Sequence, residues 1–104
     1  MPSIGRDLRK VDRRARVAVE ARVYAEETIC HLCDIPVNKA LPAGLPGSKE
    51  VDEIIPVSFG GDPFDRSNCR LVHKSCNSRR GNMTVAEFRR RYLRSQPLVT
   101  SRDW

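Results

Sequence analysis

The stretch SNCRLVHKSCNSRRG, residues 67–81, joins two kinds of structural pattern without a break. Its NCRLV segment has the apolar and β-branched character of a short strand over residues 68–72. From His73 onward, HKSCNSRR suits a short helix that stops at Gly81. Two residues separate His73 from Cys76, and a first helical turn with this spacing presents both side chains to one ion. The stretch therefore predicts a strand that leads directly into a metal-binding helix.

A second pair with the same spacing, Cys30 and Cys33 in CHLC, completes a candidate metal site. Two such pairs of ligands close a tetrahedral zinc site. Zinc with four protein ligands has no open coordination position, so we expect a structural zinc ion. The predicted zinc ligands are Cys30, Cys33, His73 and Cys76.

Cys69 is the rival ligand in this region. It would make an all-cysteine set in place of His73, although strand alternation also explains it as a small buried thiol beside Leu71. A third alternative is that no metal binds and His73 has another role. These alternatives stay open at the level of the sequence.

The segment VDEIIPVSFGG, residues 51–61, supplies the partner strand. We expect a strand over residues 50–55, ended by Pro56 and by the turn at Gly60 and Gly61. It contains two neighbouring acids, Asp52 and Glu53. Neighbours on a regular strand point to opposite faces, so both acids would reach one ion only if the strand ended or bulged there.

Helices are predicted on both sides of this core. Residues 6–27 lack Gly and Pro and place Leu8, Val11, Ala15 and Ala18 at helical spacing, which predicts an apolar helix face. Residues 34–49 are rich in Pro and Gly and form a loop. Thr84 and Glu87 form a capping box for a last helix from Val85 to about Ser95, with Phe88 and Tyr92 facing inward.

Length and charge indicate one small domain with a polyanionic partner. The chain has 104 residues, and a core of this size often needs a staple. In a reducing cytosol its four cysteines favour metal over disulfides. There are 19 Lys and Arg against 13 Asp and Glu, a net charge of +6, and seven arginines lie between residues 76 and 104. Nucleic acid is the first candidate partner, and a solvated charged surface is the alternative.

The sequence gives no sign of a membrane segment. No apolar run approaches the roughly 18 residues of a membrane span. The start, MPSIGRDLRKVDRR, lacks the hydrophobic segment of a signal peptide. We therefore expect an intracellular protein located in the cytoplasm.

Taken together, CHLC, VDEIIPVSFGG and SNCRLVHKSCNSRRG resemble the HNH endonuclease family, the ββα-metal nucleases. The resemblance covers roughly residues 29–82 and is greatest to small zinc-containing bacteriophage proteins, many of which are encoded beside DNA-packaging genes. It implies an α+β fold with a ββα-metal (His-Me finger) core and a structural zinc knuckle. Residues 1–104 would form a single domain with helical flanks at about 6–27 and 84–96.

The resemblance also implies roles for four residues. Asp52 matches the acid that binds a catalytic divalent cation, and Asn77 matches a second ligand of that cation, expected to be Mg²⁺ or Mn²⁺. Asn68 matches the central asparagine, which braces the loop and holds the general base, the residue that activates water. Glu53 stands where the family usually has the histidine that activates water. Hard oxygen ligands such as Asp52 and Asn77 are those that Mg²⁺ prefers.

Glu53 departs from the family pattern and leaves three readings open. Ordinary pKa values are about 4.3 for Glu and about 6.5 for His, so an unperturbed Glu is the weaker base. In the first reading Glu53 is a working base whose pKa is raised. In the second it is an additional cation ligand, and in the third its presence marks an impaired site.

We expect a divalent-metal-dependent endonuclease that nicks or cuts double-stranded DNA, encoded by a phage or prophage and linked to genome packaging. Terminase or portal proteins would then be partners. The alternative is a zinc-stabilised DNA-binding or packaging-accessory module with impaired catalysis; a homing or restriction nuclease is a third possibility. The arginines expected to contact phosphates are Arg79 and Arg80, then Arg89, Arg90 and Arg91, and Arg9, Arg13 and Arg16.

Overall fold

The computed structural model describes residues 12–93, and residues 1–11 and 94–104 lie outside this range. Its centre is a two-stranded antiparallel sheet of β1 (Lys49–Glu53) and β2 (Cys69–His73). β2 runs directly into helix α3 (Lys74–Arg80), so the predicted strand-to-helix junction is confirmed. Both strands begin and end within two residues of the predicted limits. Together with the helices they confirm the α+β class.

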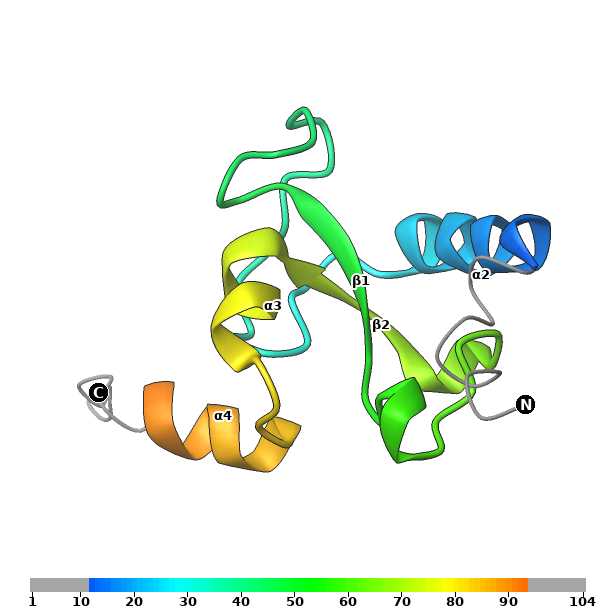
Figure 1. The fold of residues 1–104 in the computed structure, drawn as a ribbon. Coiled ribbons are helices and arrows are strands. Elements are labelled where there is room, and N and C mark those ends of the chain that lie inside the picture. Colours follow the sequence, from blue (N-terminus) through cyan, green and yellow to red (C-terminus); the bar gives the residue numbers. More distant parts are fainter. Residues whose placement is uncertain (1–11, 94–104) are drawn as a thin grey trace.

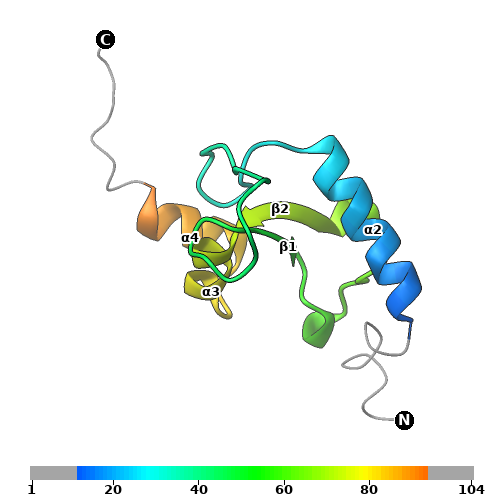
Figure 2. The same ribbon diagram turned by 90° about the horizontal axis from the view of Figure 1, so that it is seen from above.

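The hairpin lies between helices that come from the two ends of the described chain (Figures 1 and 2). Helix α2 (Arg13–Glu26) packs on one side, and α3 packs on the other. The two strands pair in regular register from Lys49 opposite His73 to Glu53 opposite Cys69. The connection between them holds two short 3₁₀ turns, Val57–Phe59 and Arg66–Asn68.

The buried face of α2 differs from the predicted one. Ala18, expected to face the core, is exposed, and Leu8 and Val11 lie outside the described residues. The inward face instead follows Arg16, Val19 and Val23. Arg16 is buried because it finds carboxylate and carbonyl partners beneath the helix. Periodicity identified the helix, and Ala15 is half-buried, but the prediction that Ala18 faces the core was wrong.

Helix α3 ends, and helix α4 begins, at the residues that the sequence predicted. Gly81, at a φ of 52°, follows the last turn of α3. Thr84 and Glu87 form the predicted capping box at the start of α4 (Val85–Tyr92). Phe88 is fully buried, and its ring lies 4.8 Å from that of Tyr92. The continuation expected toward Ser95 lies outside the described residues.

The hydrophobic core is small. Its buried members among the described residues come from α2, the CHLC knuckle, the loop after the knuckle, β2, α3 and α4, and three of them are cysteines: Cys30, Cys69 and Cys76. No helix within residues 12–93 has the length and apolar character needed to cross a membrane. A core of this size stabilises a domain only modestly, which agrees with the expectation that a bound metal adds stability.

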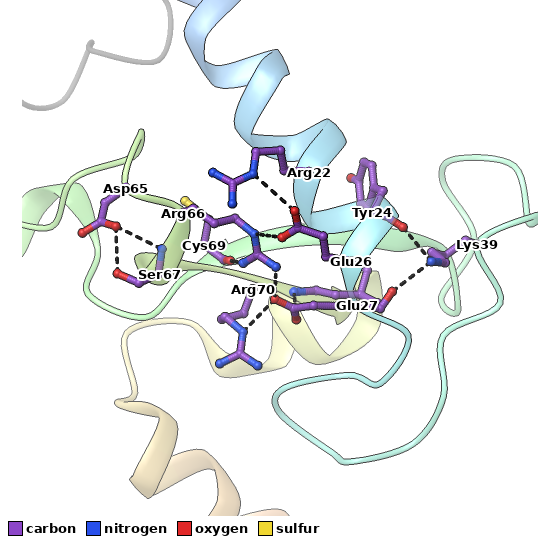
Figure 3. Close-up of polar contacts among 11 residues, drawn as sticks. Arg22, Tyr24, Glu26, Glu27, Lys39, Asp65, Arg66, Ser67, Cys69 and Arg70 are labelled. Atoms are coloured by element: carbon purple, nitrogen blue, oxygen red, sulfur yellow. Dashed lines mark hydrogen bonds and ion pairs between the residues drawn. The ribbon is translucent and has the colours of Figure 1, made fainter.

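Charged side chains fasten the C-terminal end of α2 to β2 (Figure 3). Glu27 accepts hydrogen bonds from the Leu71 amide at 3.1 Å and from Arg70 at 2.9 Å, and it pairs with Arg66 at 2.8 Å. Lys39 donates to the carbonyl oxygens of Tyr24 and Glu27, at 2.6 and 2.9 Å. A cation at this end of a helix satisfies its last carbonyl groups.

The same contacts set the ionisation of Glu27. Burial alone would raise the pKa of its carboxyl, but the hydrogen bonds from Leu71, Arg66 and Arg70 bring the pKa below the ordinary value of 4.5. A carboxyl with a lowered pKa in the folded state stabilises the fold above its unfolded pKa. This stabilisation is lost as the pH falls through the folded value.

We therefore predict that Glu27→Gln lowers the free energy of unfolding at pH 7 by about 2 kcal/mol, since it weakens hydrogen bonds to a charged group. Urea unfolding of native protein and variant between pH 7 and pH 3 measures the difference. The difference should shrink below about pH 4.5. Both proteins are measured with saturating zinc over the pH range in which circular dichroism shows them folded, because acid release of the metal would unfold both. A difference that does not change as the pH falls within that range would contradict the prediction.

Candidate functional site

The four predicted zinc ligands come together at one end of the hairpin. Cys30 and Cys33 lie in the knuckle that follows α2, His73 ends β2, and Cys76 lies in the first turn of α3. Their ligand atoms all lie within 4.8 Å of one another. The Nδ1 atom of His73 is 3.4 Å from Cys33 Sγ and 3.8 Å from Cys76 Sγ. This cluster has the composition and compactness of a site that holds zinc.

The electrostatics of the cluster call for a cation. Burial, reinforced by the neighbouring thiols, raises the pKa of Cys76 to about 12. Burial also raises the pKa of Cys33. Thiols packed this closely cannot all ionise unless a metal ion offsets their charge, and metal binding would displace their protons. The clustering of these thiols beside His73 is therefore chemically consistent with a metal site.

Cys69 lies outside this cluster. Its thiol is fully buried, 3.3 Å from Arg16 Nη1 and 3.4 Å from the carbonyl oxygen of Pro63. Burial raises the pKa of this thiol as well. The geometry thus favours His73 over Cys69 as the fourth ligand, and Cys69 is a buried thiol of the α2 side.

Asp52 faces helix α3. Its Oδ2 accepts a hydrogen bond from Arg80 Nη1, at 2.5 Å. Two residues earlier on the same strand face, Glu50 Oε1 accepts from the Asn77 Nδ2 group at 2.8 Å. The structure therefore brings Asp52 and Asn77, the two residues expected to hold a catalytic cation, to the same β1–α3 contact.

Glu53 faces helix α2 instead. Its carboxylate lies 3.3 Å from Arg16 Nη1, and the residue is only 7% exposed. β1 does end at Glu53, two residues before the predicted limit, but it has no bulge there: Glu53 still pairs with Cys69 in regular register, so the two acids keep opposite directions. The two neighbouring acids are therefore held by different helices on opposite faces of the hairpin.

Asn68 fastens the turn that follows β1. Its Oδ1 accepts from the Ile55 amide at 2.9 Å, and its Nδ2 donates to the carbonyl oxygens of Ile55 and Asp62 at 3.0 and 3.2 Å. Gly61 is needed in this turn, since a Cβ there would lie 1.6 Å from the Ile55 carbonyl oxygen. Asn68 thus makes loop contacts of the kind that the resemblance implies for the central asparagine.

The arginines expected at a DNA surface divide into two groups. Arg16 and Arg80 are 6% and 3% exposed, so neither presents a guanidinium to solvent for a phosphate contact. Arg80 donates to Asp52 and to the carbonyl oxygens of Glu53, Ile54 and Met83. The prediction counted basic residues along the chain and did not allow for acceptors that are buried by tertiary contacts.

The other arginines lie nearer the surface. Arg89 pairs with Asp34 at 2.6 Å and reaches the carbonyl oxygens of the CHLC knuckle, which ties α4 to the zinc cluster. The exposed members of the predicted set are Arg13, Arg79, Arg90 and Arg91. Arg79 also lies over the Tyr92 ring, 5.2 Å from its centroid. Arg9 lies outside the described residues.

Sequence reasoning missed two members of this region, Glu50 and the ion pair between Arg16 and Glu53. Strand alternation could have placed Glu50 on the face of Asp52, because the two residues are two apart. Nothing local signals that Arg16 meets Glu53, since the two lie on separate elements far apart in the chain.

For the metal cluster we predict that Cys76→Ser abolishes tight zinc binding and unfolds the protein, because a structural zinc ion contributes folding free energy directly. Reconstitution of the apo protein with Co²⁺, followed by the thiolate-to-metal and d–d absorption bands, measures binding. Circular dichroism measures folding in the same samples.

Cys69→Ser is the matched control, since it removes a buried thiol that lies outside the cluster. It should retain the cobalt spectrum of the native protein. A spectrum lost in Cys69→Ser and kept in His73→Ala would instead establish the all-cysteine set.

Comparison with known proteins agrees with this geometry. The family model described as HNH endonuclease matches residues 30–83, from the first cysteine of the knuckle to the residue before the α4 cap. No curated protein and no solved structure gives a significant match. The match spans the zinc cluster, the hairpin, the Asn68 turn and α3, which is more than half of the chain. The chain is a member of the HNH endonuclease family.

Proposed function

We propose that this protein is a divalent-cation-dependent endonuclease that hydrolyses phosphodiester bonds in double-stranded DNA. One observation carries the proposal: within an HNH endonuclease domain, Asp52 and Asn77 both lie at the contact between β1 and α3, Asp52 against Arg80 and Asn77 against Glu50. Family membership supports nuclease activity on DNA, and the position of these residues supports the cation site.

Asp52 and Asn77 would hold the catalytic cation, Mg²⁺ or Mn²⁺. A carboxylate and an amide provide hard oxygen ligands and leave positions for water and a phosphate oxygen. Arg80 engages Asp52 at Oδ2, so we assign Oδ1 to the cation. When bound, the ion would stabilise negative charge on the phosphate and on the leaving oxygen. Asn68 would keep the turn after β1 in place beside the scissile phosphate.

Glu53 would act as the general base in place of histidine. Its position at the end of β1, next to Asp52, supports this role. Its contact with Arg16 adds a condition, because the carboxylate has to reach a water molecule as well as the guanidinium. Arg16 would then decide how much of the time Glu53 is available to water.

A second candidate function is a zinc-stabilised DNA-binding or packaging-accessory module with impaired catalysis. The observation that favours it is the same ion pair: Glu53 is buried against Arg16, on the hairpin face opposite Asp52. In that case Glu53 would serve only to fasten α2 to the hairpin.

We predict that the native, zinc-loaded protein nicks or cuts supercoiled plasmid with Mg²⁺ or Mn²⁺ and that Glu53→Gln slows cleavage about 100-fold or more, as expected for loss of a general base. Asp52→Ala should abolish cleavage by removing a cation ligand. Asp52→Asn belongs in the same series, since its amide oxygen still accepts from Arg80 and avoids an unpaired buried guanidinium.

Cys69→Ser is the control for Glu53→Gln, because it alters the same cluster around Arg16 without changing the acid. It should cut at the native rate. A native protein that binds DNA but never cuts would establish the accessory module. Normal cleavage by Glu53→Gln would remove Glu53 from the role of base and leave the nuclease proposal in place.

The exposed arginines Arg79, Arg90 and Arg91 on α3 and α4 would contact phosphates, with Arg13 on α2 as a further contact. We predict that Arg90→Gln combined with Arg91→Gln weakens DNA binding and reduces the slope of log K against log salt by about 2, since each phosphate contact releases counterions. Fluorescence anisotropy at several salt concentrations measures the slope. Arg14→Gln combined with Arg22→Gln, at two exposed positions of α2, is the charge-matched control, and an equal effect there would contradict the assignment.

We also propose, from the resemblance to small phage proteins, that the protein acts in the cytoplasm of a bacterial host during phage genome packaging. Terminase or portal proteins would be its partners. Genes for these proteins beside this one would support the proposal, and a neighbourhood without phage genes would count against it.

A further inference from the structure

We propose that Glu50 is a positioning residue that turns the amide oxygen of Asn77 toward the catalytic cation. The inference rests on the proposed cation site at Asp52 and Asn77 and adds a residue to which the family resemblance assigned no role. It follows from the hydrogen bond between Glu50 and Asn77.

Two polar pairs join β1 to α3 side by side. Glu50 and Asp52 are two residues apart on one strand and face the same way. Asn77 and Arg80 are three residues apart on α3 and share one face of the helix. Asn77 therefore meets Glu50, at 2.8 Å, and Arg80 meets Asp52.

The chemistry of the amide makes the Glu50 contact directional. A side-chain amide has an oxygen that accepts and a nitrogen that donates, and only the oxygen binds a hard cation. A carboxylate only accepts hydrogen bonds, so Glu50 Oε1 takes the Asn77 Nδ2 group. The Asn77 Oδ1 atom is then the end left for the cation.

Loss of the acceptor would release this orientation. The last torsion of asparagine is broad and roughly two-fold, so an amide without a partner presents oxygen or nitrogen with similar ease. A ligand held by an outer hydrogen bond loses about 10- to 100-fold in metal affinity when that partner is removed. Glu50 would thus act on cation affinity through Asn77.

Charge is a separate effect of the same residue. The Arg80 guanidinium lies against Asp52 and disfavours a second cation there, and the negative charge of Glu50 offsets it. Replacing Glu50 by an apolar residue removes both the charge and the acceptor. Glu50→Gln would not keep the orientation, because its amide can donate to Asn77 Oδ1 as well as accept from Nδ2. The effect of charge is therefore separated by repeating the Glu50 substitution in an Asn77→Asp background, where the charge is removed in the same way but no amide has to be oriented.

The test is a titration of zinc-loaded protein with Mn²⁺, followed by the electron paramagnetic resonance signal of free Mn²⁺. Zinc already fills the sulfur-rich cluster, so added Mn²⁺ reports the oxygen site. We expect Glu50→Leu to bind Mn²⁺ at least about tenfold more weakly than the native protein, which is the loss expected for an outer partner of a ligand. In the Asn77→Asp background this ratio should fall several-fold, because the loss of charge is the same but a carboxylate presents oxygen in either orientation.

Equal Mn²⁺ affinities for the native protein and Glu50→Leu would overturn the proposal. A tenfold ratio that persists in the Asn77→Asp background would also overturn it, since Glu50 would then not act through the amide. Glu50→Ala is a second variant without an acceptor, for use if Glu50→Leu does not fold by circular dichroism. A native protein that binds no Mn²⁺ would overturn the cation site itself, an outcome distinct from failure of the Glu50 role alone.

Discussion

The meeting of Cys30, Cys33, His73 and Cys76 is the constraint on which the rest of this structure depends. These side chains come from two segments far apart in the chain, the knuckle after α2 and the junction between β2 and α3. The apolar core around them is small and includes cysteines of the cluster. A metal ion at this point would hold the hairpin, α3 and the knuckle together, and Arg89 extends the same attachment to α4.

Buried arginines provide the second set of connections. Arg80 ties α3 to the end of β1 through three acceptors, on Asp52, Glu53 and Ile54, and Arg16 ties α2 to the opposite face of the same strand. A buried charge is tolerated only where partners satisfy it, and breaking such a pair costs more than the pair contributes. These arginines therefore serve the framework of the site, and the exposed arginines lie elsewhere, on α2, α3 and α4.

The resulting site separates two residues that are adjacent in the sequence. Asp52 belongs to the contact with α3, where Glu50 and Asn77 also lie, and Glu53 belongs to the contact with α2. The Arg16–Glu53 ion pair holds the Glu53 carboxylate on the α2 side of the hairpin. If Glu53 is the general base proposed above, catalysis would depend on how that ion pair responds to a bound substrate.

Much of the fold and of the metal cluster followed from the sequence by itself. The two strands, the stop of α3 at Gly81, the capping box at Thr84 and the pairs of zinc ligands all depend on spacings of two to four residues, which local geometry translates directly into structure. Tertiary structure alone decided that Arg16 and Arg80 are buried, that Glu53 faces α2 and that Glu50 meets Asn77. Each of these depends on which remote element packs against which face of the hairpin. The residue pattern within one strand or helix does not specify which element packs against it.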